Sequence, residues 1–215
     1  MIQLEVWGPY ALFTRGEMKV ERVSYDVPTP SAARGIVENL YYHPGIRWHI
    51  RRIYVLNPIE FTTIRRNEVK SKILGGTAMR IAQGKEDEPC LVTTKQIVQR
   101  ASMVLTNVHY VIEAEFEMLL EKAAPGDNPG KFQDIVTRRM RKGQCFSPPY
   151  FGCREFPAHF KQWEGGPIPT IDETRDLGFM LYDFDYSDSQ NITPLYFRAK
   201  MEHGVIQVAG CEVFR

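Results

Sequence analysis

Apolar and polar residues alternate along several stretches of the chain. Such alternation predicts β-strands, because successive side chains of a strand point to opposite faces of a sheet. In the N-terminal part the pattern covers Gln3–Phe13, Arg47–Leu56, Phe61–Ile73, Ile97–Leu105 and Val108–Leu119. It returns near the C-terminus in Leu177–Tyr186, Thr193–Met201 and Val205–Val208. We expect the runs on either side of residues 106 and 107 to be two strands that pair with each other.

Two further stretches carry the signals of helices. The first starts at Thr29, whose hydroxyl can cap a helix, and it runs through a proline to the turn at residues 43–45. The second starts after Asn128, again with a proline, and stops at Gly143. Both carry apolar residues at helical spacing, so each is expected to pack one face on a core. The segment Gly75–Pro89, with its glycines and charges, is expected to be irregular.

The order of these elements is typical of an α+β fold. A strand, a helix, further strands, a second helix and a strand suit a ferredoxin-like core of the RNA-recognition type, in which two helices cover one face of an antiparallel sheet. The strands that follow predict a C-terminal antiparallel β-sheet extension. We therefore expect a ferredoxin-like domain over residues 1–143 and a small β-rich domain over residues 144–215.

The composition fits a globular cytoplasmic protein. No apolar run approaches the roughly 20 residues needed to cross a bilayer, so no membrane partner is expected. The N-terminus lacks the charged start and apolar stretch of a signal peptide. The sequence predicts no cofactor and no metal site, because acids show no spaced ligand set and the cysteines form no CxxC pair. The cysteines are Cys90, Cys145, Cys153 and Cys211.

The net charge is only +1, but basic residues outnumber acidic ones in two segments, 34–72 and 131–161. A protein with this distribution can present a basic face to a polyanion. The candidates for contacts with an RNA backbone or a hairpin groove are Arg51, Arg52, Arg65, Arg66, Arg138, Arg139 and Arg154. The alternative is that some of these arginines pair with nearby acids or only face solvent.

The segment after the second predicted helix contains three aromatic residues, Phe146, Tyr150 and Phe151. Their rings could stack on unpaired bases of a nucleic acid. They could equally pack the junction between the two predicted domains, and we favour packing, because burial is the common state of large aromatic rings.

Seven stretches along nearly the whole chain form a recognisable combination. They are Gly8–Thr14, Tyr25–Pro44, Arg47–Ile59, Arg65–Val69, Asn107–Phe116, Asn128–Lys131 and Gly143–Phe156. In this combination the chain resembles the CRISPR-associated protein 5 family, specifically its subtype I-C members. The resemblance implies metal-independent cutting of CRISPR precursor RNA in the repeat hairpin. It also implies that the protein stays on the 5′ tag of the guide RNA, with other subunits of the subtype I-C interference complex, and it leaves open a metal-dependent activity on DNA.

The resemblance also implies where the reaction takes place. The family has a tyrosine at the end of the first helix, which maps to Tyr41, and a lysine at the start of the second, which maps to Lys131. The family's next residue is a histidine, whereas this chain has Phe132, which fits the apolar stripe of the predicted helix. We expect His43 to be the first candidate for the missing group, because it follows the tyrosine. The other candidates are His49, His109, His159 and His203, and Tyr42 replaces Tyr41 if the alignment shifts by one residue.

RNA can be cut without metal because its own 2′-hydroxyl can attack the adjacent phosphate, giving a 2′,3′-cyclic phosphate and a 5′-hydroxyl. A protein helps by taking the 2′-OH proton, protonating the leaving 5′-oxygen and stabilising charge on the phosphate. Lys131 suits charge stabilisation at the start of its helix. A free phenol has a pKa of about 10, so Tyr41 can donate a proton or orient the phosphate without any shift of its pKa. A role as base would need a cationic neighbour such as Lys131 to lower that pKa. The alternative, favoured by Phe132, is a non-catalytic subunit that only binds the 5′ tag.

Overall fold

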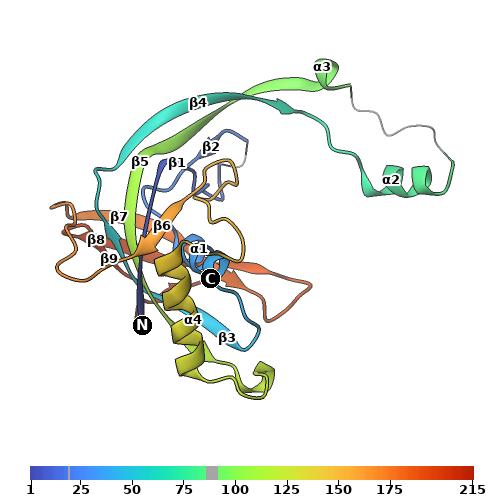
Figure 1. The fold of residues 1–215 in the computed structure, drawn as a ribbon. Coiled ribbons are helices and arrows are strands. Elements are labelled where there is room, and N and C mark those ends of the chain that lie inside the picture. Colours follow the sequence, from blue (N-terminus) through green and yellow to red (C-terminus); the bar gives the residue numbers. More distant parts are fainter. Residues whose placement is uncertain (19, 86–91) are drawn as a thin grey trace.

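The computed structural model describes residues 1–18, 20–85 and 92–215, so Cys90 lies outside the described residues. It confirms a mixed fold of helices and a large, mainly antiparallel sheet (Figure 1). In the described ranges, no helix is long and apolar enough to cross a membrane. The elements are β1 (Ile2–Ala11), β2 (Arg22–Val23), α1 (Pro30–Leu40), β3 (Ile46–Val55), β4 (Glu60–Val69), α2 (Gly75–Ala82), α3 (Thr93–Gln96), β5 (Ile97–Met118), η1 (Leu120–Lys122), α4 (Pro129–Lys142), β6 (His159–Gln162), β7 (Arg175–Asp185), β8 (Thr193–Glu202), β9 (Val205–Gln207) and β10 (Val213–Phe214).

The centre of the molecule is a sheet in which β3, β5, β1 and β6 are neighbours in that order. All three pairs are antiparallel. One face of this sheet carries Leu4, Trp48 and Ile112, which are buried in a single apolar core together with the inner faces of α1 and α4. The strands predicted over β1 and β3 and the two predicted helices are therefore confirmed.

Both helices begin where their capping residues predict. The Thr29 hydroxyl accepts a hydrogen bond from the Ala32 N–H at 3.1 Å. The Asn128 side-chain oxygen accepts one from the Lys131 N–H at 2.9 Å. Each cap satisfies a backbone donor that the first turn of a helix leaves unpaired, so these two side chains fix the start of α1 and the start of α4.

The two runs expected to form paired strands are one strand. β5 spans 22 residues. β3 pairs with its C-terminal part and β4 with its N-terminal part, so β3 and β4 lie end to end along one edge of β5. Asn107 has a positive φ of 48° in this strand, and the Asn57 amide donates to its carbonyl at 2.8 Å. The chain does not reverse here: β1 pairs with β5 on both sides of Asn107, at Thr106 and at Val108, so the strand continues through it.

β4 and the N-terminal half of β5 form a two-stranded arm that leaves the main body (Figure 1). α2 and α3 lie at its far end, and α2 falls in the segment Gly75–Pro89 that the sequence predicts to be irregular. The 8-residue helix α2 is a departure from that expectation. It buries no residue, and its N-cap residue, Leu74, makes no side-chain hydrogen bond, so no capping signal marks its start in the sequence.

The C-terminal strands β7 to β10 agree with the expected β-rich tail. β9 pairs with β3, so these strands continue the central sheet. The short strand β6 is not predicted by the sequence pattern, and it pairs with β1 although it lies beyond residue 143. The sheet thus continues across both ranges, and the division into domains 1–143 and 144–215 stays a prediction.

The segment that follows α4 is fixed against the end of β1. The Leu12 N–H donates to the Phe151 carbonyl at 3.0 Å, and the Phe151 ring is fully buried. Gly152 follows with a φ of +78°, and a Cβ atom placed there would lie 2.0 Å from the Leu12 carbonyl oxygen. Only glycine therefore allows the two backbones to approach in this way.

We predict that Gly152→Ala lowers the free energy of unfolding by more than about 2 kcal/mol, since it adds a backbone clash to a strained conformation. Gly166→Ala is the matched control, because Gly166 has a similar φ of +82° and a Cβ atom added there would meet nothing within 4 Å. Chemical denaturation of the two variants measures the difference. Equal losses in both would show that the approach to Leu12 is not tight.

Candidate active site

Tyr41 follows the last residue of α1, and its backbone is extended, with a φ of −149° and a ψ of 111°. α1 therefore ends at Leu40, before the predicted turn, and the Tyr41 side chain points inwards with only 7% of its surface exposed. The centroid of its ring lies 6.0 Å from that of Phe132 and 5.0 Å from the guanidinium carbon of Arg139. Trp48 Nε1 donates to the Tyr41 carbonyl at 3.1 Å, which ties this turn to β3.

Phe132 is fully buried. Its ring packs on that of His43, with 4.8 Å between centroids, and on that of Phe116 at 6.2 Å. The prediction that Phe132 lies on the apolar face of its helix is confirmed, because Val136 and Met140 are buried beside it. Since Phe132 is in the first turn of α4, its packing brings the start of α4 to the end of α1.

Lys131 forms an ion pair with Asp127, which precedes α4. Its ammonium lies 2.9 Å from Asp127 Oδ1, and Asp127 Oδ2 accepts the Ala124 N–H at 2.8 Å. The bond to Lys131 is the main reason that the pKa of Asp127 is lowered, and the Ala124 N–H adds to it. The same bond raises the pKa of Lys131. Both groups are therefore charged at neutral pH, and the ammonium keeps two further protons for other acceptors.

His43 lies on the other side of Asp127. Its Nδ1 accepts the Gly45 N–H at 3.0 Å, and its Nε2 is 3.7 Å from Asp127 Oδ2. An acceptor nitrogen carries no proton, so the hydrogen bond assigns the ring proton to Nε2. In this arrangement His43 has no open lone pair, and a role in proton transfer requires that the bond to Gly45 be broken.

Burial raises the pKa of the Tyr41 phenol above its ordinary value of about 10, and the positive charges of Arg139 and Lys131 oppose this effect only in part. The phenol therefore remains protonated at neutral pH. A protonated phenol donates a hydrogen bond but cannot accept a proton as a base. The site thus favours a donor role for Tyr41 over a base role.

The structure brings the predicted residues Tyr41, His43 and Lys131 together around Phe132 and Asp127. Lys131 and Tyr41 are close enough to influence each other's pKa. Asp127 is not among the residues that the sequence predicts. Its only signal is its position four residues before Lys131, a spacing that favours ion pairs inside a helix, whereas Asp127 lies before the N-cap of α4.

The predicted RNA-binding arginines are divided between different parts of the molecule. Arg139 joins the site, where it also donates to the Leu40 carbonyl at 2.8 Å. Arg51 and Arg52 lie on β3, and they pair with Glu115 at 3.1 Å and with Glu113 at 3.8 Å. In the protein without RNA, these two arginines therefore pair with acidic residues, which is the alternative that the sequence left open. Their contact with RNA stays a prediction.

The remaining four predicted arginines have different surroundings. Arg66, on the arm, forms an ion pair with Glu155 and also faces the Phe156 ring. The side chains of the other three are exposed, and they are Arg65, Arg138 and Arg154. Within the described residues these three form no ion pair, so they are open to phosphate groups; contact with RNA remains a prediction for all four.

The other histidines have partners elsewhere in the structure. His49 pairs with Glu117, His109 with Glu5 and His203 with Asp172, while His159 stacks on Trp7. Throughout the part of the chain that the structure describes, no group of three or more His, Cys, Asp or Glu side chains is arranged to hold a metal ion.

Comparisons with known proteins identify the class of protein to which the chain belongs. Residues 1–209 match the family model described as CRISPR-associated protein (Cas_Cas5), named Cas_Cas5d. The chain therefore belongs to the Cas5d family of CRISPR-associated proteins.

Two curated relatives carry the same name, CRISPR pre-crRNA endoribonuclease Cas5d. The protein from Mannheimia succiniciproducens is 45% identical over 96% of this chain and 94% of its own length. The protein from Thermus thermophilus is 35% identical over 96% of this chain and 90% of its own length. A solved structure of a CRISPR-associated protein is similar in fold, with a TM-score of 0.70, 23% identity and coverage of 100% of this chain and 96% of that chain.

We predict that Asp127→Asn slows RNA cleavage by about tenfold or more, because the ammonium of Lys131 loses the carboxylate that holds it in place. Binding of RNA should stay equal or improve, since one negative charge is removed. Asp134→Asn is the matched control, because Asp134 is an exposed acid on the same helix. Single-turnover rates and gel-shift affinities measure the two effects. A loss of binding equal to the loss of rate would contradict the positioning role.

Proposed function

We propose that this chain is a metal-independent, sequence-specific endoribonuclease that cuts CRISPR precursor RNA in the repeat hairpin by attack of the 2′-hydroxyl. The observation that carries the proposal is the meeting of Lys131 and Tyr41 at the facing ends of α4 and α1. It is supported by the curated relatives, which are named pre-crRNA endoribonucleases and align with nearly the whole chain.

The core that carries the site is proposed to be ferredoxin-like. Its elements follow the order β1, α1, β3, β5, α4 and β6, and its strands lie in the order β6, β1, β5, β3. A βαββαβ unit with two helices on one face of an antiparallel sheet is the arrangement of that fold. The connection from β3 to β5 is the unusual part, because the arm and its helices are inserted there.

Lys131 is proposed to neutralise the phosphate as negative charge accumulates in the transition state. Its ammonium is fixed by Asp127 at 2.9 Å, and the side chain remains 48% exposed, so it can reach a phosphate from outside. Preorganised charge of this kind is worth more in catalysis than a mobile surface lysine, because it needs no reorganisation during the reaction.

Tyr41 is proposed to donate a hydrogen bond to the phosphate or to the leaving 5′-oxygen. Its raised pKa keeps the proton on the phenol. His43 is proposed to hold Asp127 and Phe132 in the free protein, and to exchange protons with the RNA only if substrate binding breaks its bond to Gly45. The 2′-OH proton would otherwise leave to water or to another group of the RNA.

The protein is also proposed to remain on the 5′ tag of the product, beside other subunits of a subtype I-C interference complex. A non-catalytic tag-binding subunit is the second candidate function. The observation that favours it is the buried Phe132, which occupies the place where the family has a titratable histidine.

Incubation of the purified protein with the repeat hairpin of its own locus in EDTA distinguishes the two functions. We predict one cut that leaves a 2′,3′-cyclic phosphate and a 5′-hydroxyl, and no cut when the nucleotide before the linkage is 2′-deoxy. Lys131→Ala should slow cleavage by about 100-fold or more while affinity changes little. Lys142→Ala, at the exposed C-terminal end of the same helix, is the control. Tight binding of RNA that stays intact would support the tag-binding function instead.

The pH dependence follows from the direction of the pKa shifts. The pKa values of Tyr41 and Lys131 are both raised, so both protons are retained as the pH rises to 9.5. The pKa of Asp127 is lowered, so its pair with Lys131 is lost only when the pH falls through that lowered value. We predict that the single-turnover rate shows no alkaline loss between pH 7 and pH 9.5. A fall with a midpoint near pH 8 would show that another group supplies the essential proton.

A further inference from the structure

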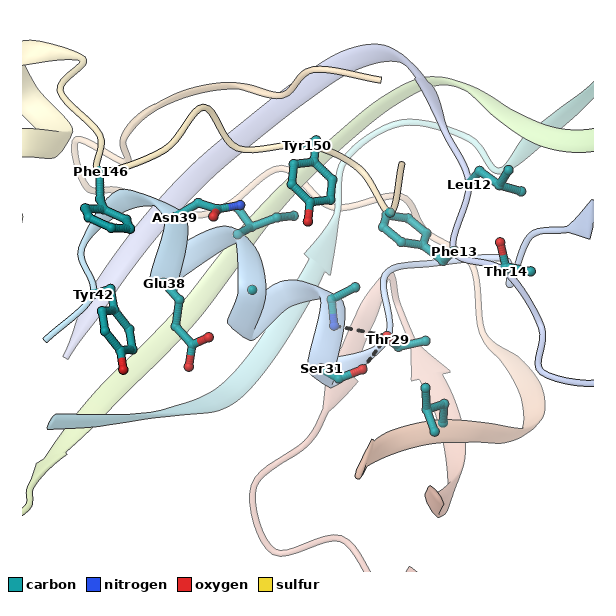
Figure 2. Close-up of a pocket in the computed structure, with 15 residues that line it drawn as sticks. Leu12, Phe13, Thr14, Thr29, Ser31, Glu38, Asn39, Tyr42, Phe146 and Tyr150 are labelled. Atoms are coloured by element: carbon teal, nitrogen blue, oxygen red, sulfur yellow. Dashed lines mark hydrogen bonds between the residues drawn. The ribbon is translucent and has the colours of Figure 1, made fainter. Parts of the chain in front are cut away.

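Two exposed aromatic rings lie beside the site. Tyr42 is 57% exposed and Phe146 is 67% exposed, and their ring centroids are 6.2 Å apart with a tilt of 38°. Figure 2 shows them at one end of a surface pocket that follows α1. Of the three aromatics in the segment after α4, Phe151 is buried and Tyr150 is partly buried, so packing explains them, but it leaves Phe146 without an explanation.

The position of these rings is fixed by the backbone. The Phe146 N–H donates to the carbonyls of Asn39 at 2.9 Å and of Leu40 at 3.2 Å, and the Ser147 N–H donates to Asn39 at 3.0 Å. These are carbonyls of the last turn of α1, which have no partner within the helix. The segment after α4 therefore caps the helix that presents the tyrosines, and Phe146 is held on a rigid support.

The same carbonyl connects the exposed rings to the candidate active site. The Leu40 oxygen also accepts from Arg139 at 2.8 Å, and Arg139 lies over the Tyr41 ring. Because Tyr41 has extended backbone, the next side chain points the opposite way, so Tyr41 faces inwards and Tyr42 outwards. Consecutive Cα atoms are about 3.8 Å apart, so a base one or two nucleotides from the reacting linkage can reach Tyr42.

The pocket suits a base better than a phosphate. It has a volume of about 530 Å³, and no lysine or arginine lines it. Its polar groups include the Asn39 amide, the Glu38 carboxylate and the Thr29 and Ser31 hydroxyls, which Figure 2 shows along its length. Amide and carboxylate groups can hydrogen-bond to the edge of a base that is stacked on the rings.

We propose that Tyr42 and Phe146 form a stacking site for an unpaired base of the RNA, next to the linkage that is cut. The proposal rests on the proposed function, since it takes the RNA held at Lys131 and Tyr41 as the occupant. Stacking of a base on an aromatic side chain is sequence-tolerant and commonly contributes about tenfold or more to affinity. The site would hold the single strand beside the hairpin and so place the linkage at Lys131.

The test uses repeat RNA that carries 2-aminopurine at each unpaired position in turn and a 2′-deoxy nucleotide before the cut, so that it stays intact. We expect quenching of the fluorescence at one or two positions near the linkage with the wild-type protein. Tyr42→Ala and Phe146→Ala should remove the quenching and weaken RNA affinity by about tenfold. Tyr42→Phe and Phe146→Tyr keep the rings and should restore both.

Phe179→Ala is the matched control, because Phe179 is 58% exposed on β7 and does not line the pocket. With cleavable RNA, the two alanine variants should lose rate mainly at subsaturating protein and recover it at saturation. Unchanged quenching and affinity in both variants, or equal losses in Phe179→Ala, would overturn the stacking site. Failure of the wild-type protein to cut, with quenching still abolished by Phe146→Ala, would refute the proposed cleavage and leave the stacking site standing.

Discussion

Burial of the Phe132 ring is the interaction on which the candidate active site depends. The ring packs among those of Tyr41, His43 and Phe116 and is closed off from solvent. Loss of a buried phenylalanine side chain typically costs about 3–5 kcal/mol, so such a contact holds two elements together firmly. Lys131 is the preceding residue, and its ammonium is held by Asp127 at the edge of the same cluster. Phe132 is therefore the residue that holds the candidate site together.

Much of the fold could be predicted from local signals. Thr29 and Asn128 fix the starts of both helices, and alternation marks β1 and β3, because caps and alternation act over a few residues. The prediction of a hairpin from the two runs of β5 is wrong, since alternation does not reveal which strand a run pairs with. The short strand β6 carries too few apolar residues to stand out from its surroundings.

The candidate site was predictable only in part, for a similar reason. Tyr41, His43 and Lys131 meet as expected, but Asp127 became visible only through the loop that places its carboxylate against Lys131. The arginines show the same limit. Arg51 and Arg52 form part of a basic run in the sequence, yet the pairing of β3 with β5 places Arg52 opposite Glu113 and brings Arg51, at the bulge before it, within ion-pair distance of Glu115. A segment that is basic in sequence therefore need not form a basic surface, because strand pairing can place acidic side chains beside its arginines.

Proton positions, more than formal charges, set what this site can do. Burial keeps the proton on Tyr41, the pair with Asp127 keeps it on Lys131, and the Gly45 N–H directs the ring proton of His43 to Nε2. The site therefore presents hydrogen-bond donors, which suit a phosphate that gains negative charge.

A structure of the protein with a 2′-deoxy repeat hairpin tests this account most directly. We predict that the Lys131 ammonium and the Tyr41 hydroxyl both lie within hydrogen-bond distance of the same phosphate. A phosphate held elsewhere, with these two groups facing solvent, would contradict it.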